Sequence, residues 1–159
     1  MQVPTTSTYL STAVAVIVIT LLSVAAVEAQ NLEDRPNLGG IEFLGRGLLY
    51  SANYERYVNR VGFGAGFASW RIDHKTIAVL PVYVSFRPIG NTHSLYLSAG
   101  ATVGSQVKTL FNKPTFACAT AAVGYEHLSK SGLVIRPTMN LLFNGEALLW
   151  PGLMVGYRF

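Results

Sequence analysis

Acidic and basic residues that could form a buried charge network recur at alternate positions of apolar segments. Six of them fall on the polar side of these alternations: Glu42, Glu55, Glu126, Arg87, Arg136 and Arg158. Because successive side chains of a β-strand point to opposite faces, the pattern predicts that all six share one face of a sheet. If that face is the interior of a small barrel, opposite charges should pair there, since an isolated buried charge is costly. The sequence therefore predicts an internal salt-bridge plug, and a gated ion path is the functional alternative.

Catalytic and metal-binding patterns are weak by comparison. The three histidines, His74, His93 and His127, lie near separate predicted turns and lack the spacing of a metal site. Glu126, His127 and Ser129 resemble the His/Ser/Glu set of barrel lipid A deacylases, although the flanking sequence does not match. The sequence thus favours no catalytic residue, cofactor or metal. A small barrel enzyme acting on outer-membrane lipid is the alternative function.

The composition excludes several classes of protein. Half of the 159 residues are apolar and 13% are charged, which excludes a disordered chain. The net charge of +4 includes no basic run and argues against nucleic-acid binding. The single cysteine, Cys118, excludes an internal disulfide framework, and no basic neighbour is present to activate its thiol.

The first 40 residues differ from the rest of the chain. Residues 13–27 are apolar apart from Thr20 and Ser23, and Val27-Glu28-Ala29 has the small-residue pattern of a cleavage site. This arrangement predicts a secretory signal peptide over residues 1–29, followed by a periplasmic lead-in over 30–40. Residues 1–11 contain no lysine or arginine, which departs from the signal-peptide pattern. An uncleaved membrane helix over 9–27 is the alternative, because its length is close to the roughly 20 residues that a membrane span requires.

Period-two alternation dominates the remaining sequence and predicts eight strands. Their ranges are 41–45, 47–58, 61–72, 77–88, 94–107, 116–128, 132–144 and 147–159. The connections between them are mostly short and contain the turn residues Gly, Asn, Asp, Ser and Pro. An even number of antiparallel strands places both ends of the segment on the same side. The predicted fold is an all-β, eight-stranded, up-and-down transmembrane barrel over residues 41–159.

The apolar positions of these strands fit a lipid-facing surface. The expected lipid band includes Leu80, Val82, Val84, Leu95, Leu97, Val103, Ala119, Ala121, Val123, Met139 and Leu141. Aromatic residues expected at one membrane interface are Tyr54, Phe63, Phe86, Tyr125, Tyr157 and Phe159. The alternative is a soluble calyx of the lipocalin type, in which these residues face inward and the arginines face water. The directions of Val82, Arg87 and Arg136 distinguish the two.

The two ends of the mature chain resemble a known family. Residues 39–56, Gly-Gly-Ile-Glu-Phe-Leu-Gly-Arg-Gly-Leu-Leu-Tyr-Ser-Ala-Asn-Tyr-Glu-Arg, are similar to the opening of small outer-membrane β-barrel proteins of Bacteroidota-type bacteria. Residues 150–159, Trp-Pro-Gly-Leu-Met-Val-Gly-Tyr-Arg-Phe, are similar to their ending. The resemblance implies an integral protein of a Gram-negative outer membrane, with lipid as its surroundings and no assigned chemistry. The terminal Phe159 resembles the residue that the barrel-assembly machinery recognises in final strands.

One predicted outer loop is the best candidate for contact with the surroundings. In residues 108–115, Lys108 and Lys113 flank the apolar pair Leu110 and Phe111. Such a loop could contact lipopolysaccharide phosphates or a partner protein, or it could be a solvated loop that folds back on the rim. Structural or surface interaction is therefore the predicted role of the protein.

Overall fold

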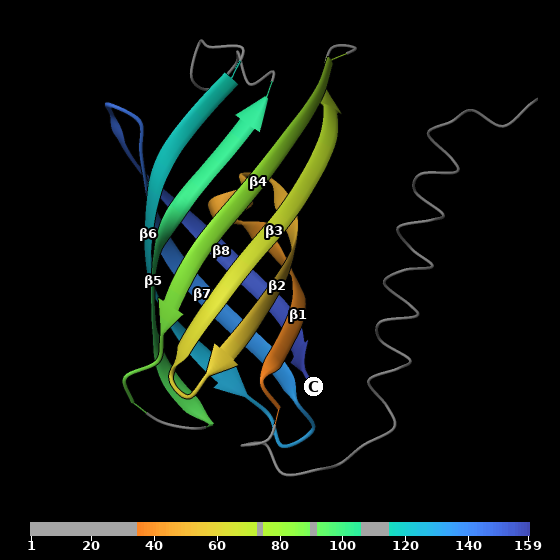
Figure 1. Cartoon of the computed structure of the whole chain (residues 1–159), viewed down its shortest axis with the longest axis vertical. Coiled ribbons are helices and arrows are strands. Elements are labelled where there is room, and N and C mark those ends of the chain that lie inside the picture. The colour runs from red at the N-terminus through yellow and green to blue at the C-terminus, as the bar shows by residue number, and fades with distance from the viewer. Residues whose placement is uncertain (1–34, 73–74, 90–91, 106–114) are drawn as a thin grey trace, which may run out of the picture. The chain divides into compact units, whose positions relative to one another are not determined.

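Eight strands close into a single antiparallel barrel in the computed structural model, which describes residues 35–72, 75–89, 92–105 and 115–159. The elements are β1 (Asn37–Leu44), η2 (Gly45–Gly47), β2 (Tyr50–Val58), β3 (Val61–Ile72), β4 (Lys75–Phe86), β5 (His93–Ser105), β6 (Thr115–Leu128), β7 (Leu133–Phe143) and β8 (Ala147–Arg158). Each strand pairs with its sequence neighbours, and β1 pairs with β8 to close the wall (Figure 1). The predicted fold class, an eight-stranded antiparallel β-barrel, is confirmed.

The first strand is longer than predicted. It begins at Asn37 instead of residue 41, and it pairs with both β2 and β8 from its first residues. Gly39 and Gly40, which the prediction placed before the strand, belong to the wall. A Cβ atom on Gly40 would lie 2.7 Å from the Cα atom of Gly156, so glycine allows a close approach of β1 and β8 there. The predicted lead-in 30–40 therefore ends within β1, and its residues 30–34, like the predicted signal peptide 1–29, lie outside the described residues.

The turn after β1 corrects a second prediction. Residues 45–47 were expected to form an outer connection with a new strand from residue 47, but they form the short 3-10 turn η2, and β2 starts at Tyr50. All three residues of η2 are buried, and the turn contacts β1, β2, β3, β4, β7 and β8. Positive φ angles at Leu44 (58°) and Leu48 (69°) direct the chain away from the wall and back to it. Non-glycine residues rarely adopt such angles, so burial of η2 has to offset their cost.

The remaining strand boundaries lie within two residues of the predicted ones, and the side chains alternate as predicted. In β2, exposed and buried residues alternate over the whole strand. Val82 is 44% exposed, whereas Arg136 is 0% and Arg87 is 8% exposed. Val82 therefore faces outward, and Arg87 and Arg136 face inward, which excludes the calyx arrangement. In the described part of the chain, no helix is long and apolar enough to cross a membrane.

Candidate functional site

The interior of the barrel holds an ion-pair network built from three strands. Arg136 of β7 donates a 2.9 Å hydrogen bond from Nη1 to Oε2 of Glu55 on β2. The same guanidinium donates two hydrogen bonds to Oε2 of Glu126 on β6, one of 2.8 Å from Nε and a shorter one from Nη2. Arg87, which follows β4, donates a 3.0 Å hydrogen bond to Oε1 of Glu126. Four of the six predicted lumen charges are thus joined in one chain of contacts.

Arg136 is the hub of this network, because every polar atom of its guanidinium has a partner. Besides the two carboxylates, its Nη2 donates to the Tyr57 hydroxyl at 2.9 Å, and its guanidinium carbon lies 3.9 Å from the centre of the Tyr96 ring. Its side chain is fully buried. A buried charge is tolerated only when it is paired and hydrogen-bonded, and Arg136 meets both conditions.

A second pair joins Glu42 of β1 to Arg46 of the inward turn η2. The carboxylate and the guanidinium are 3.3 Å apart, and both side chains are at most 1% exposed. Arg46 stacks on the Tyr83 ring at 3.6 Å and donates hydrogen bonds to the Tyr96 hydroxyl and to Ser98. The backbone of the turn is held as well, since the Thr102 hydroxyl donates to the carbonyl of Arg46 at 3.2 Å.

Arg46 is a charged lumen residue that the sequence pattern did not identify. It lies in a Gly-Arg-Gly segment between two alternating runs, so strand periodicity assigns it to neither face. The signal that could have found it is compositional: glycine on both sides permits a tight turn, and Leu48, also buried, follows directly.

Arg158, the sixth predicted charge, is placed differently from the others. Its guanidinium lies 4.6 Å from the centre of the Tyr57 ring, and that of Arg87 lies 3.8 Å from it. Arg158 makes no ion pair with any residue in the described ranges. The prediction of three acids matched by three arginines was therefore incomplete, because Arg46 adds a fourth arginine to the lumen.

Apolar side chains fill the lumen on both sides of the charges. One cluster consists of Leu48, Ala68, Ile77, Val79, Phe116, Cys118 and Leu142, with Trp70, Leu148 and Trp150 against it. A smaller one consists of Leu38, Tyr57, Leu128, Val134 and Met154. The polar residues Asn53, Tyr83, Thr138 and Asn140 are also buried. The interior is a packed core, as expected where eight strands leave room for side chains alone.

The possible catalytic trio is not assembled. Glu126 points into the lumen and is 1% exposed, whereas His127 lies on the outer face next to His93. The Ser129 hydroxyl bonds to that of Ser131, 2.7 Å away. Cys118 is buried in the larger apolar cluster. The part of the chain that the structure describes contains no group of three or more His, Cys, Asp or Glu side chains that could hold a metal ion.

Two further predictions lie outside the described residues. These are His74 and the candidate contact loop with Lys108, Leu110, Phe111 and Lys113. The role of that loop stays a prediction.

Comparison with known proteins bears on the fold. No protein-family model and no curated protein matches the sequence. Among solved structures, the N-terminal β-barrel domain of Pseudomonas aeruginosa OprF matches with a TM-score of 0.63 and 11% identity, over 77% of this chain and 96% of that one. The chain therefore shares a closed β-barrel fold with that domain. The Yersinia pestis attachment invasion locus protein Ail also matches, in a crystal structure (TM-score 0.45, 18% identity, 77% and 95% coverage) and in a phospholipid nanodisc (0.47, 16%, 77% and 97%).

Proposed function

We propose that the protein is an integral barrel of a Gram-negative outer membrane, with a closed lumen and a structural or surface-interaction role. The observation that carries the proposal is the reversal of ordinary polarity: large apolar side chains lie outside, and the ion-paired charges lie inside. In water, an exposed apolar surface of this extent would drive aggregation. Facing lipid, it is the surface that a membrane barrel requires.

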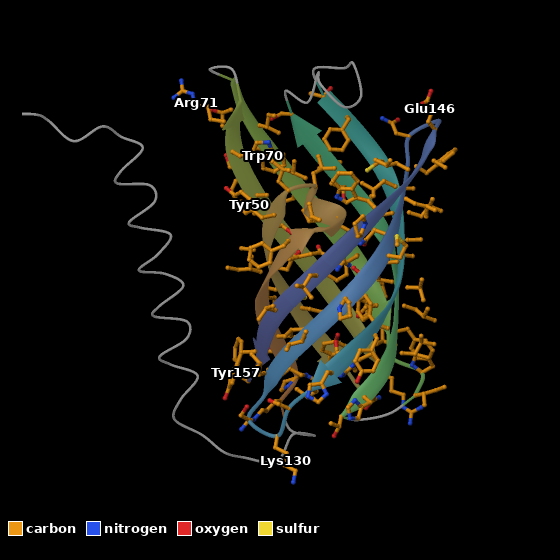
Figure 2. The ribbon with its side chains drawn as sticks, turned by 180° about the vertical axis from the view of Figure 1, so that it is seen from behind. Tyr50, Trp70, Arg71, Lys130, Glu146 and Tyr157 are labelled. Carbon is orange, nitrogen blue, oxygen red and sulfur yellow. The ribbon has the colours of Figure 1, made fainter. Side chains whose placement is uncertain are left out.

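The exposed charges support the same proposal through their positions. The exposed side chains of Arg56, Arg60, Arg71, Lys130 and Glu146 all lie in turns or within the last residues of a strand. Figure 2 shows Arg71 and Glu146 at one end of the barrel and Lys130 at the other. Between the ends, the outer wall is free to contact acyl chains.

The finer parts of the proposal rest on the sequence. The sequences at the two ends of the mature chain, residues 39–56 and 150–159, support a place among the small barrels of Bacteroidota-type bacteria. Phe159 would present the final strand to the barrel-assembly machinery, and a signal peptide over 1–29 would direct export. The buried ion pairs and the absence of an assembled trio in the described part of the chain support a protein without enzymatic activity.

A narrow channel is the second candidate function. The specific observation in its favour is the surplus of lumen arginine together with polar atoms that have no hydrogen-bond partner in the described ranges, among them Tyr83 Oη and Arg158 Nε. An ion path would need such groups along its length.

Two measurements test the proposal. Membrane fractionation should recover the protein with outer membranes and release it only with detergent, because its outer wall is apolar. Recovery in the soluble fraction without detergent would overturn the membrane assignment. In planar bilayers, purified wild-type protein should show no conductance steps because side chains fill the lumen. Reproducible small steps would favour the channel instead.

A further inference from the structure

Two histidines meet on the outer face at one end of the barrel. His93 is the first residue of β5, and His127 lies one residue before the end of β6. They are direct partners in the antiparallel register of these strands, although 34 positions separate them in sequence. The inward neighbours Ser94 and Glu126 are at most 2% exposed, so the two imidazoles lie outside the wall. The sequence spacing gave no hint of this contact, which depends on the register.

The two rings present nitrogen atoms to each other. Their centroids are 4.8 Å apart and their planes are inclined by 36°. The Nδ1 atoms are only 3.4 Å apart, closer than the centroids, so these nitrogens lie on the facing edges of the rings. A good hydrogen bond from a ring nitrogen is shorter, at about 2.7–3.2 Å. The two nitrogens are therefore too far apart for a strong direct hydrogen bond.

The separation matches that of two ligands on one tetrahedral ion. Zinc binds histidine nitrogen at about 2.0–2.1 Å. Two such bonds to nitrogens 3.4 Å apart enclose an angle between about 108° and about 116°, close to the tetrahedral value. A square-planar ion with bonds of the same length would need nitrogens about 2.9 Å apart. The spacing of His93 and His127 thus favours a tetrahedral ion.

We propose that His93 and His127 form a binding site for a divalent transition-metal ion of the zinc type on the outer face of the β5–β6 pair. Each imidazole supplies Nδ1, and water completes the coordination. The hydroxyl of Tyr125, two residues before His127, contacts the same Nδ1 of His93 and stacks near its ring, with centroids 5.9 Å apart. Because a ring nitrogen has one lone pair, a metal ion bound at Nδ1 of His93 has to displace this hydroxyl.

A bound ion would link the start of β5 to the end of β6. In the sequence, residues 106–114 separate these two strands. A ligand that binds the folded barrel and not the unfolded chain stabilises the fold. The stabilisation grows with the logarithm of the ratio of the ligand concentration to the dissociation constant. Zinc should therefore raise the temperature at which the barrel loses its folded gel mobility. This effect depends on metal binding alone and does not depend on the proposed membrane role.

The chain offers a matched control, because it contains three histidines and the third, His74, is outside the pair. We suggest titrating untagged full-length protein in detergent with zinc chloride by calorimetry. Wild type and His74→Ala should bind one ion with equal affinity. His93→Ala and His127→Ala should each bind at least about tenfold more weakly, whereas Tyr125→Phe, which lacks the hydroxyl that competes for Nδ1 of His93, should bind zinc at least as tightly as wild type. Folded gel mobility before heating verifies that each variant is intact, and His93→Gln replaces any alanine variant that fails to fold.

The same set of proteins decides the proposal in a second measurement. Zinc should raise the unfolding temperature of wild type and of His74→Ala, and leave that of His93→Ala and His93→Gln unchanged. Equal zinc affinity in wild type and His93→Ala, loss of binding in His74→Ala, or no binding by wild type would each overturn the proposal.

Discussion

The two halves of the lumen differ in their main filling. The half nearer the two chain ends of the barrel contains the Glu55–Arg136–Glu126 network, in which every charge has a specific partner. The half nearer the turn at residues 144–146 contains the larger apolar cluster, in which apolar side chains pack against one another. One wall of eight strands encloses both. The barrel fold therefore requires a filled interior and leaves the kind of filling open.

The difference predicts different responses to substitution. An apolar cluster loses free energy according to the volume removed, and its neighbours can relax into the space. A buried ion pair that loses one member leaves an uncompensated charge, and relaxation does not remove that cost. The charged half should therefore be the more sensitive one, even though a buried ion pair adds little net stability over an apolar pair of similar size.

Glu55→Ala should have the largest effect. The substitution leaves Arg136 with one carboxylate partner and deprives the Ser85 hydroxyl of its acceptor. Breaking a buried pair in this way costs about 3–5 kcal/mol. Urea unfolding in detergent should show a loss of this size in the free energy of unfolding. Glu55→Gln, which keeps the shape and a hydrogen-bond acceptor, should lose less, and equal stability of Glu55→Ala and wild type would mean that the network is hydrated rather than closed.

Leu142→Ala tests the apolar half. Leu142 is 1% exposed and belongs to the larger cluster. Its truncation loses transfer free energy and leaves a cavity, together about 3–4 kcal/mol. The same urea measurement checks this value. Xenon or a small apolar ligand should bind the variant and restore part of the loss, and a loss below that of an exposed-site control would indicate that this half is loosely packed.

Which side chains face the lumen could be predicted from the sequence, whereas their pairing could not. Glu55 and Arg136 each lie in a segment in which apolar and polar residues alternate. The period of two assigns both of them to the inner face without knowledge of the fold. The tilt and shear of the closed barrel decide which inward-facing side chains of different strands lie at the same level of the lumen. The alternation within a single strand carries no information on tilt or shear. Arg136 thus has two carboxylate partners, while Arg158 stacks on Tyr57 instead.

The errors at β1 and η2 have a related cause. Period-two analysis assumes that a residue belongs to the wall, so it cannot represent a turn that folds into the barrel, as Arg46 does. The predicted first strand began after Gly40, but Gly40 belongs to β1, where the close approach of β8 requires glycine. Both features depend on contacts between the first strand and distant elements.

Leu141→Ala should have the smallest effect of the three and sets the reference for the comparison. Leu141 precedes Leu142 in β7 but points outward and is 40% exposed. The two variants remove the same atoms from adjacent positions of one strand. In lipid vesicles, Leu141→Ala should lose only the transfer free energy, about 1.5–2 kcal/mol, because acyl chains occupy the freed space and no cavity remains. The difference between the two variants, about 1–2 kcal/mol, then measures the cavity term of the apolar half.

If the outer wall faced water, Leu141→Ala would change stability by less than about 0.5 kcal/mol, as surface substitutions do. Urea unfolding of both variants in the same vesicles distinguishes these outcomes, and a loss at Leu141 as large as that at Leu142 would place a packed protein partner, instead of lipid, against this part of the wall.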